Sequence, residues 1–104
     1  AVDAAVATTI CAGVAQPFAS GIGGGCVMNI FMKEEKKALI LDSREVAAAF
    51  STVDMFVGRE INSTYGALAV AVPGELKGLY LAWERFGSLE WKVLVEPSIA
   101  IAEE

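Results

Sequence analysis

The stretch Ser20-Gly21-Ile22-Gly23-Gly24-Gly25 separates two segments of different periodicity. Glycine has no Cβ, so it reaches backbone conformations that other residues avoid and lets two backbones approach closely. The segment before the stretch, residues 2–15, is rich in alanine and valine, whereas the segment after it, residues 26–32, alternates. The order of elements is therefore helix, glycine turn, strand, and it predicts an α/β (α+β) domain.

A glycine-rich stretch can also hold a nucleotide phosphate, but the order of elements argues against that role here. A phosphate loop follows a strand and precedes a helix, because the helix N-terminus faces the phosphate. In this chain the helical segment comes first, and no Gly-Lys-Ser or Gly-Lys-Thr follows. A tight helix-to-strand turn is the better interpretation.

Residues 2–15 predict a helix with one apolar face and small residues over most of the other face. A helix that is apolar all round is a buried helix, so we expect other elements to cover it. Pro17 predicts where it ends, because the residue before a proline is pushed out of the helical region. The apolar face is formed by Val2, Ala5, Val6, Thr9, Ile10 and Gly13.

Residues 26–32 and 38–42 predict two strands of an antiparallel hairpin, joined by the charged turn Lys33-Glu34-Glu35-Lys36-Lys37. In the first strand Cys26, Met28, Ile30 and Met32 point to one side, and Val27, Asn29 and Phe31 to the other. Since both sets are largely apolar, we expect both faces of the hairpin to be covered.

The middle of the chain gives weaker signals. Ser51 with Asp54 three residues later resembles a capping box and predicts a short helix through Phe56. Residues 58–65 are polar and predict a loop. Residues 66–72 are apolar and predict a third strand or a buried extended segment.

The last third of the chain predicts helices. Pro73 suits the first position of a helix, and Gly87 suits its end. A further short helix is expected over residues 91–95, with Ser88 as its cap, and residues 97–104 predict the opening of another helix. The apolar stripe of the first of these helices consists of Leu76, Leu79, Tyr80, Trp83 and Phe86.

Composition narrows the possible functions. The chain has 104 residues, a net charge of −5 and no basic stripe, which disfavours nucleic acid as a partner. It contains no histidine and two cysteines, Cys11 and Cys26. A Ser-His-Asp triad, a Cys-His pair and a histidine-ligated metal are therefore excluded within this chain. The two cysteines are too few for a zinc site or a disulfide scaffold.

The apolar content of the chain is high for its length. Hydrophobic residues make up 55% of it, which predicts that further polypeptide buries part of this surface. Residues 4–32 carry no formal charge and exceed the roughly 20 residues of a membrane-spanning helix. The glycines and Gln16-Pro17 interrupt this run, so a membrane segment is the weaker alternative. No intact signal peptide is expected, because no charged region precedes an apolar one.

Arg44 is the candidate binding residue. It stands in Asp42-Ser43-Arg44-Glu45, where the second predicted strand ends. A guanidinium offers a planar set of donors that matches a carboxylate, so the position suits the α-carboxylate of an amino-acid substrate. The alternative is a surface arginine paired with Asp42 or Glu45. Asn62-Ser63-Thr64 is a glycosylation sequon, which matters only in a secreted protein.

Five motifs in register resemble the γ-glutamyltranspeptidases (glutathione hydrolases), over the early part of that family's large subunit. Ala48 departs from the usual proline of the family, and Cys26 from its usual glycine or leucine. The motifs are Ala1-Val-Asp-Ala-Ala5, Ser20-Gly-Ile-Gly-Gly-Gly25, Asp42-Ser-Arg-Glu45, Ala71-Val-Pro-Gly-Glu75 and Glu96-Pro-Ser-Ile99.

The resemblance implies an N-terminal-nucleophile hydrolase, an αββα sandwich of which residues 1–104 form a single partial domain. The family's precursor cleaves itself, and the new N-terminal threonine of the small subunit attacks the γ-glutamyl amide of glutathione. The γ-glutamyl group then passes to water, an amino acid or a dipeptide. Arg44 would bind the donor's α-carboxylate, and the glycine stretch would support the sheet behind the site.

On this resemblance no catalytic residue, metal or cofactor belongs to this chain, and its partner is the small catalytic subunit. As a fragment, the chain is expected neither to catalyse nor to fold stably alone. The resemblance also implies the outer face of the plasma membrane, or the periplasm or secretion in bacteria. At a cell surface, Asn62 is a candidate for glycosylation. Cys11 is a candidate for a disulfide with a cysteine that precedes residue 1 of this sequence. The rival interpretation is a non-catalytic relative or truncated product that acts by binding only.

Overall fold

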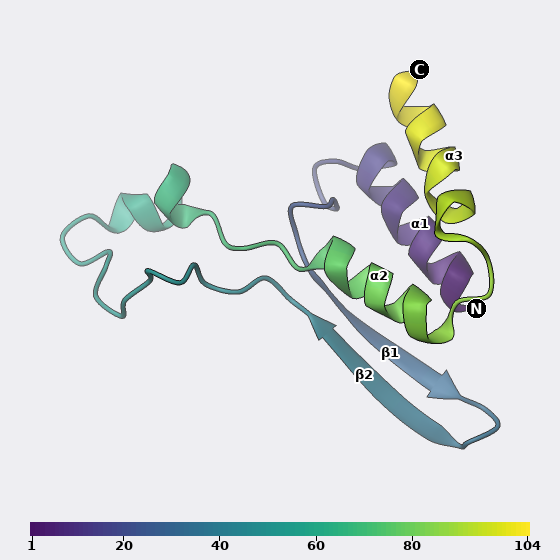
Figure 1. Cartoon of the computed structure of the whole chain (residues 1–104). Coiled ribbons are helices and arrows are strands. Elements are labelled where there is room, and N and C mark those ends of the chain that lie inside the picture. The colour runs from purple at the N-terminus through teal and green to yellow at the C-terminus, as the bar shows by residue number, and fades with distance from the viewer.

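The computed structural model describes all 104 residues. Its three α-helices lie on one side of a two-stranded hairpin, and the chain between β2 and α2 runs out away from them (Figure 1). None of the helices combines the length and the apolar character of a membrane span. The elements in order are α1 (Val2–Ala15), β1 (Cys26–Met32), β2 (Lys37–Ser43), the 3₁₀ turns η1 (Glu60–Ser63) and η2 (Ala67–Ala69), α2 (Glu75–Phe86) and α3 (Trp91–Glu103).

Helix α1 has the bounds that its periodicity predicts, but only one of its sides is covered. It packs against α3 and α2, with Val6 and Ile10 buried in a core that also contains Leu79 of α2 and Leu94 of α3. Residues on the opposite side, such as Ala4 and Thr8, are exposed. The expectation of a helix buried all round is therefore not met by this chain's own elements.

The predicted hairpin is present, with Cys26 opposite Ser43 and Met32 opposite Lys37. Its inner face packs on the helices, and Ile30 is 8% exposed. The outer face is open: Phe31 is 66% exposed and Val27 is equally accessible. The expectation that both faces are covered was wrong for these residues alone, because no element of the chain lies on the outer side (Figure 1).

The middle segment was predicted least well. Residues 51–58 form successive turns rather than a helix, and the Thr52 hydroxyl donates to Asp54 in place of a Ser51 cap. A helix this short is unstable without a packed face, and Val53 is fully exposed. Residues 66–72 form η2 and one antiparallel bridge, Val46–Val72, rather than a strand. No neighbouring strand is available to extend that bridge.

Helix α2 ends at Phe86 as predicted, but it begins at Glu75, with Gly74 as its N-cap residue and Pro73 outside it. Its buried side agrees with the predicted apolar stripe only in part. Leu79 lies in the core and Trp83 packs against it, whereas Leu76 and Tyr80 are each 45% exposed. The small Gly78 lies against Ser43 of the hairpin. The buried residues are Glu75, Gly78, Leu79 and Ala82.

Helix α3 is one continuous helix, so the two separate helices predicted over residues 91–95 and 97–104 were wrong. Pro97 lies inside it, where it removes one backbone hydrogen bond. Leu94 and Ser98, on either side of the proline, are both buried, and this packing keeps the helix intact. Ser88 does not cap it, since the N-cap residue is Glu90.

Candidate functional site

A cavity of about 570 Å³ lies where the glycine stretch, the chain after β2 and the first turn of α2 meet. Its wall contains three charged side chains, those of Arg44, Glu45 and Glu75. The remaining wall is mostly backbone of the glycine stretch, with Thr9 of α1 and Cys26 of β1. A polar hollow with a few convergent charged groups is the kind of place where a small polar ligand binds.

The glycine stretch is a structural turn that packs against two other segments. The carbonyl of Gly24 accepts hydrogen bonds from the backbone amides of Gly74 and Glu75, both at 3.0 Å, which ties the turn to the start of α2. A Cβ on Gly25 would lie 2.7 Å from the Glu45 nitrogen and 2.7 Å from the Ser43 carbonyl oxygen. The close packing at Gly25 therefore requires glycine for a structural reason, without a phosphate.

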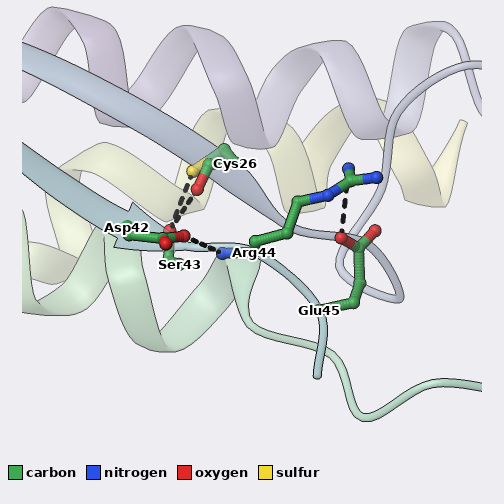
Figure 2. Close-up of polar contacts among 5 residues, drawn as sticks. All are labelled: Cys26, Asp42, Ser43, Arg44 and Glu45. Carbon is green, nitrogen blue, oxygen red and sulfur yellow. Dashed lines mark hydrogen bonds and ion pairs between the residues drawn. The ribbon is translucent and has the colours of Figure 1, made fainter. Parts of the chain in front are cut away.

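The end of the hairpin is fixed by Ser43 and Cys26, which face each other across the two strands (Figure 2). The Ser43 hydroxyl donates to the Cys26 carbonyl at 2.9 Å and lies 3.2 Å from the Cys26 sulfur. Both cysteines of the chain are free thiols and partly buried. This contact holds the strand end from which Arg44 extends.

Arg44 borders the cavity with a side chain that is 71% exposed. Its backbone amide donates to Asp42 Oδ1 at 3.0 Å, while its Nη1 lies 3.2 Å from Glu45 Oε2 (Figure 2). Of the two pairings that the sequence left open, the side chain therefore makes the one with Glu45. The rest of the guanidinium remains open to the cavity and to solvent.

Glu75 is the residue of the site that sequence reasoning missed. The sequence pattern gives it no role of its own, although it closes the motif Ala71-Val-Pro-Gly-Glu75. It is 4% exposed, and its Oε1 is buried without a hydrogen-bond donor. Burial, and secondly the negative charge of Glu45, raise the pKa of Glu75 above its ordinary value.

Two other kinds of site, a metal site and the glycosylation candidate, are not part of this cavity. The chain contains no group of three or more acidic, cysteine or histidine side chains placed to hold a metal ion. Asn62, the glycosylation candidate, lies in η1 on the segment that runs out from the helices (Figure 1) and does not line the cavity.

These observations define a class of protein segment: one helical layer on a hairpin with an open outer face, and an arginine at a strand end beside a polar cavity. The chain belongs to the γ-glutamyltranspeptidase family, whose sequence profile matches residues 1–104.

Individual relatives agree with this assignment. Over all 104 residues the chain is 48% identical to Scoloptoxin SSD14 of Scolopendra dehaani, covering 18% of that protein. It is 45% identical to Glutathione hydrolase proenzyme 2 of Schizosaccharomyces pombe, covering 17% of it. The chain thus spans less than a fifth of the length of these curated relatives.

A solved structure extends the likeness to three dimensions. The γ-glutamyltranspeptidase of Helicobacter pylori superimposes with a TM-score of 0.92 at 33% identity, over 98% of this chain and 30% of that one. The predicted fold class, a part of the layered α+β fold of N-terminal-nucleophile hydrolases, is confirmed by this likeness.

Proposed function

We propose that the protein containing this chain is a γ-glutamyl transferase and glutathione hydrolase, in which Arg44 binds the α-carboxylate of the γ-glutamyl donor. Family membership supports the activity. The observation that supports the role of Arg44 is its position at the end of β2, on the rim of a polar cavity, with one ion pair at 3.2 Å and most of its surface open.

In the proposed reaction this chain binds substrate and another part of the protein supplies the nucleophile. The N-terminal threonine of the small subunit attacks the γ-glutamyl carbonyl through its hydroxyl, and its own amine takes the proton. The amide C–N bond breaks, the amine of the leaving group is protonated, and a γ-glutamyl ester remains. Water, or the amine of an amino acid or dipeptide, then attacks the ester and releases the threonine.

Glutathione and related γ-glutamyl compounds are the proposed substrates, and the small subunit from the same precursor is the proposed partner. The word proenzyme in the name of the Schizosaccharomyces pombe relative supports a precursor that is processed. The outer cell surface, or the periplasm or exterior of a bacterium, is the proposed location, where extracellular glutathione would be available.

The experiment is Arg44→Ala in the complete protein, with the KM for a γ-glutamyl anilide measured after self-cleavage. Loss of a charged contact to the α-carboxylate costs roughly 2–5 kcal/mol, so KM should rise at least about thirtyfold while self-cleavage is retained. Arg59→Ala is the matched control, because Arg59 is exposed on the outlying segment and does not line the cavity. An unchanged KM in Arg44→Ala would remove Arg44 from the site.

The binding-only alternative has one observation in its favour, the 48% identity to a protein named as a toxin. The complete wild-type protein prepared for the KM measurement also distinguishes the enzyme from a protein that acts by binding only. Self-cleavage at a threonine, followed by release of anilide, supports the enzyme, whereas an uncleaved and inactive complete protein supports binding only.

A further inference from the structure

Two acidic side chains from distant parts of the sequence lie on the wall of the same cavity, beside Arg44. Glu75 is 96% buried by the surrounding chain, being 4% exposed, and its Oε1 has no hydrogen-bond donor. Glu45 Oε2 is also buried without a hydrogen bond, because its 3.2 Å contact with Arg44 lacks hydrogen-bond geometry. The two oxygens without a hydrogen bond therefore belong to carboxyl groups that line the same cavity.

The backbones that carry these two side chains are held in place. The amide of Glu75 donates to the Gly24 carbonyl at 3.0 Å, and the backbone of Glu45 packs against Gly25 so closely that a Cβ there would meet it at 2.7 Å. The glycine stretch thus holds the backbones of both residues, and it brings their side chains to one cavity wall.

A buried carboxylate oxygen without a donor is unfavourable, and two carboxylates in one poorly solvated site repel each other. One proton removes both problems, because a protonated carboxyl group donates to its ionised neighbour. Glu45 already has a cationic neighbour, since its Oε2 lies 3.2 Å from the Arg44 guanidinium, whereas Glu75 has none among its contacts. A proton is therefore held more readily by Glu75, the more deeply buried of the two, whose pKa is raised by burial and by the charge of Glu45.

We propose that Glu75 is a positioning residue for Arg44: as an uncharged acid it holds the Glu45 carboxylate where that carboxylate orients the guanidinium. This inference rests on the proposed function, because Arg44 acts on substrate only if it binds the donor. It adds a residue from α2 to a site that the sequence placed at the end of β2. When Glu75 ionises, it repels Glu45, and it also opposes the approach of an anionic donor.

The ionisable groups facing Glu75 are few. The chain after β2 contributes Glu45 and Arg44, and β1 contributes the Cys26 thiol. From α1 the cavity wall contains only Thr9, and the glycine stretch contributes no ionisable side chain. A change of donor affinity with pH that a substitution at Glu75 removes can therefore be assigned to this carboxyl group.

The test measures kcat/KM for a γ-glutamyl anilide against pH in the complete, self-cleaved protein, because this ratio reports groups of the free enzyme. The variants are Glu75→Gln, Glu75→Ala and the control Glu84→Gln, an exposed glutamate of the same helix. Glutamine keeps the shape and the donor of the uncharged acid, whereas alanine removes both. Circular dichroism and the extent of self-cleavage show whether each variant is folded.

We expect wild-type kcat/KM to fall as pH rises through the ionisation of Glu75. Glu75→Gln matches the wild type at acidic pH, lacks that fall, and exceeds the wild type about three- to tenfold at alkaline pH, the size of a screened charge interaction in a partly buried site. Glu75→Ala raises KM about tenfold at acidic pH with kcat unchanged, and Glu84→Gln follows the wild type.

A Glu75→Gln profile parallel to that of the wild type, or a wild-type KM in Glu75→Ala, would overturn the inference. If Glu75→Ala does not fold, the comparison of Glu75→Gln with the wild type decides alone. Arg44→Ala separates the two levels of the argument. A raised KM in Arg44→Ala with no effect of Glu75→Gln removes only the role of Glu75, whereas an unchanged KM in Arg44→Ala removes the proposed role of Arg44 as well.

Discussion

The backbone amide of Ser88 donates to both carboxylate oxygens of Asp3, at 3.1 and 3.0 Å. This contact joins the first turn of α1 to the loop between α2 and α3. Asp3 also places a negative charge at the positive end of α1, where the helix dipole favours it. One side chain thus links the beginning of the chain to the two helices that close the core.

Asp3→Ala should therefore lower the free energy of unfolding by about 1–2 kcal/mol, from one charge-assisted contact and one favourable dipole interaction. Denaturant unfolding of the complete protein measures this change. Glu34→Ala, in the exposed hairpin turn, is the control. Equal midpoints for the two variants would show that the Asp3–Ser88 contact contributes nothing.

The glycine stretch offers a comparison between two of its own positions. A Cβ on Gly25 would lie 2.7 Å from two backbone atoms, which cannot rotate away, whereas a Cβ on Gly23 meets nothing within 4 Å. Neither glycine has a positive φ, so contact alone distinguishes them. Gly25→Ala should cost about 1–3 kcal/mol, the usual penalty of overpacking, and Gly23→Ala less than about 0.5 kcal/mol. Thermal unfolding of both variants checks this, and similar losses in both would contradict it.

Ser43 contacts Cys26 of β1 and lies against Gly78 of α2, and two substitutions of Ser43 test these two contacts separately. Ser43→Ala removes the 2.9 Å hydrogen bond to the Cys26 carbonyl and should cost about 1 kcal/mol. Ser43→Val also adds methyl groups on the side where Gly78 of α2 leaves no room, so a further cost of about 1–3 kcal/mol is expected. Unfolding midpoints of the two variants give the difference. A valine variant as stable as the alanine variant would mean that α2 can move away from the hairpin.

The elements that the sequence predicted correctly are those whose signal is local. The fourteen residues of α1 have uninterrupted helical periodicity and end before Pro17, and β1 alternates over its full length. Both were predicted with the bounds that the structure has. The family resemblance, which rests on spaced motifs, was likewise sufficient for the fold class.

The errors fall where the structure depends on contacts between distant segments. A proline inside α3 could not be distinguished from a helix start, since the packing of Leu94 and Ser98 holds the helix together. The turns after Ser51 lack a packed face, which a capping signal does not reveal. Glu75 was missed for the same reason, because its place in the site comes from the Gly24 carbonyl and from Glu45, 30 or more residues away in the sequence.

Asn62 yields a prediction about processing that follows from the proposed location. It lies in the 3₁₀ turn η1, and its neighbours in that turn, Ile61 and Ser63, are exposed, so the sequon can be reached. Expression of the complete protein through a eukaryotic secretory route should add a glycan that an endoglycosidase removes. Asn62→Gln should abolish that mass difference. An unmodified Asn62 in the secreted wild type would contradict the prediction.

The raised pKa of Glu75 also makes the stability of the protein depend on pH, with a definite sign. An acid whose folded-state pKa lies above its ordinary value of 4.5 binds a proton more tightly in the folded state. Its contribution to stability is therefore fully present below pH 4.5 and is lost as pH rises through the folded-state pKa. Glu75→Gln cannot lose a proton, so its melting temperature relative to the wild type should increase with pH above 4.5 and level off once Glu75 is ionised.

Thermal unfolding scans of the complete protein at a fixed heating rate measure this difference in melting temperature, with Glu84→Gln as the control that should show none. A constant offset between Glu75→Gln and the wild type at all pH values would mean that Glu75 ionises as easily in the folded protein as in the unfolded chain, and would leave the shared proton between Glu75 and Glu45 without support.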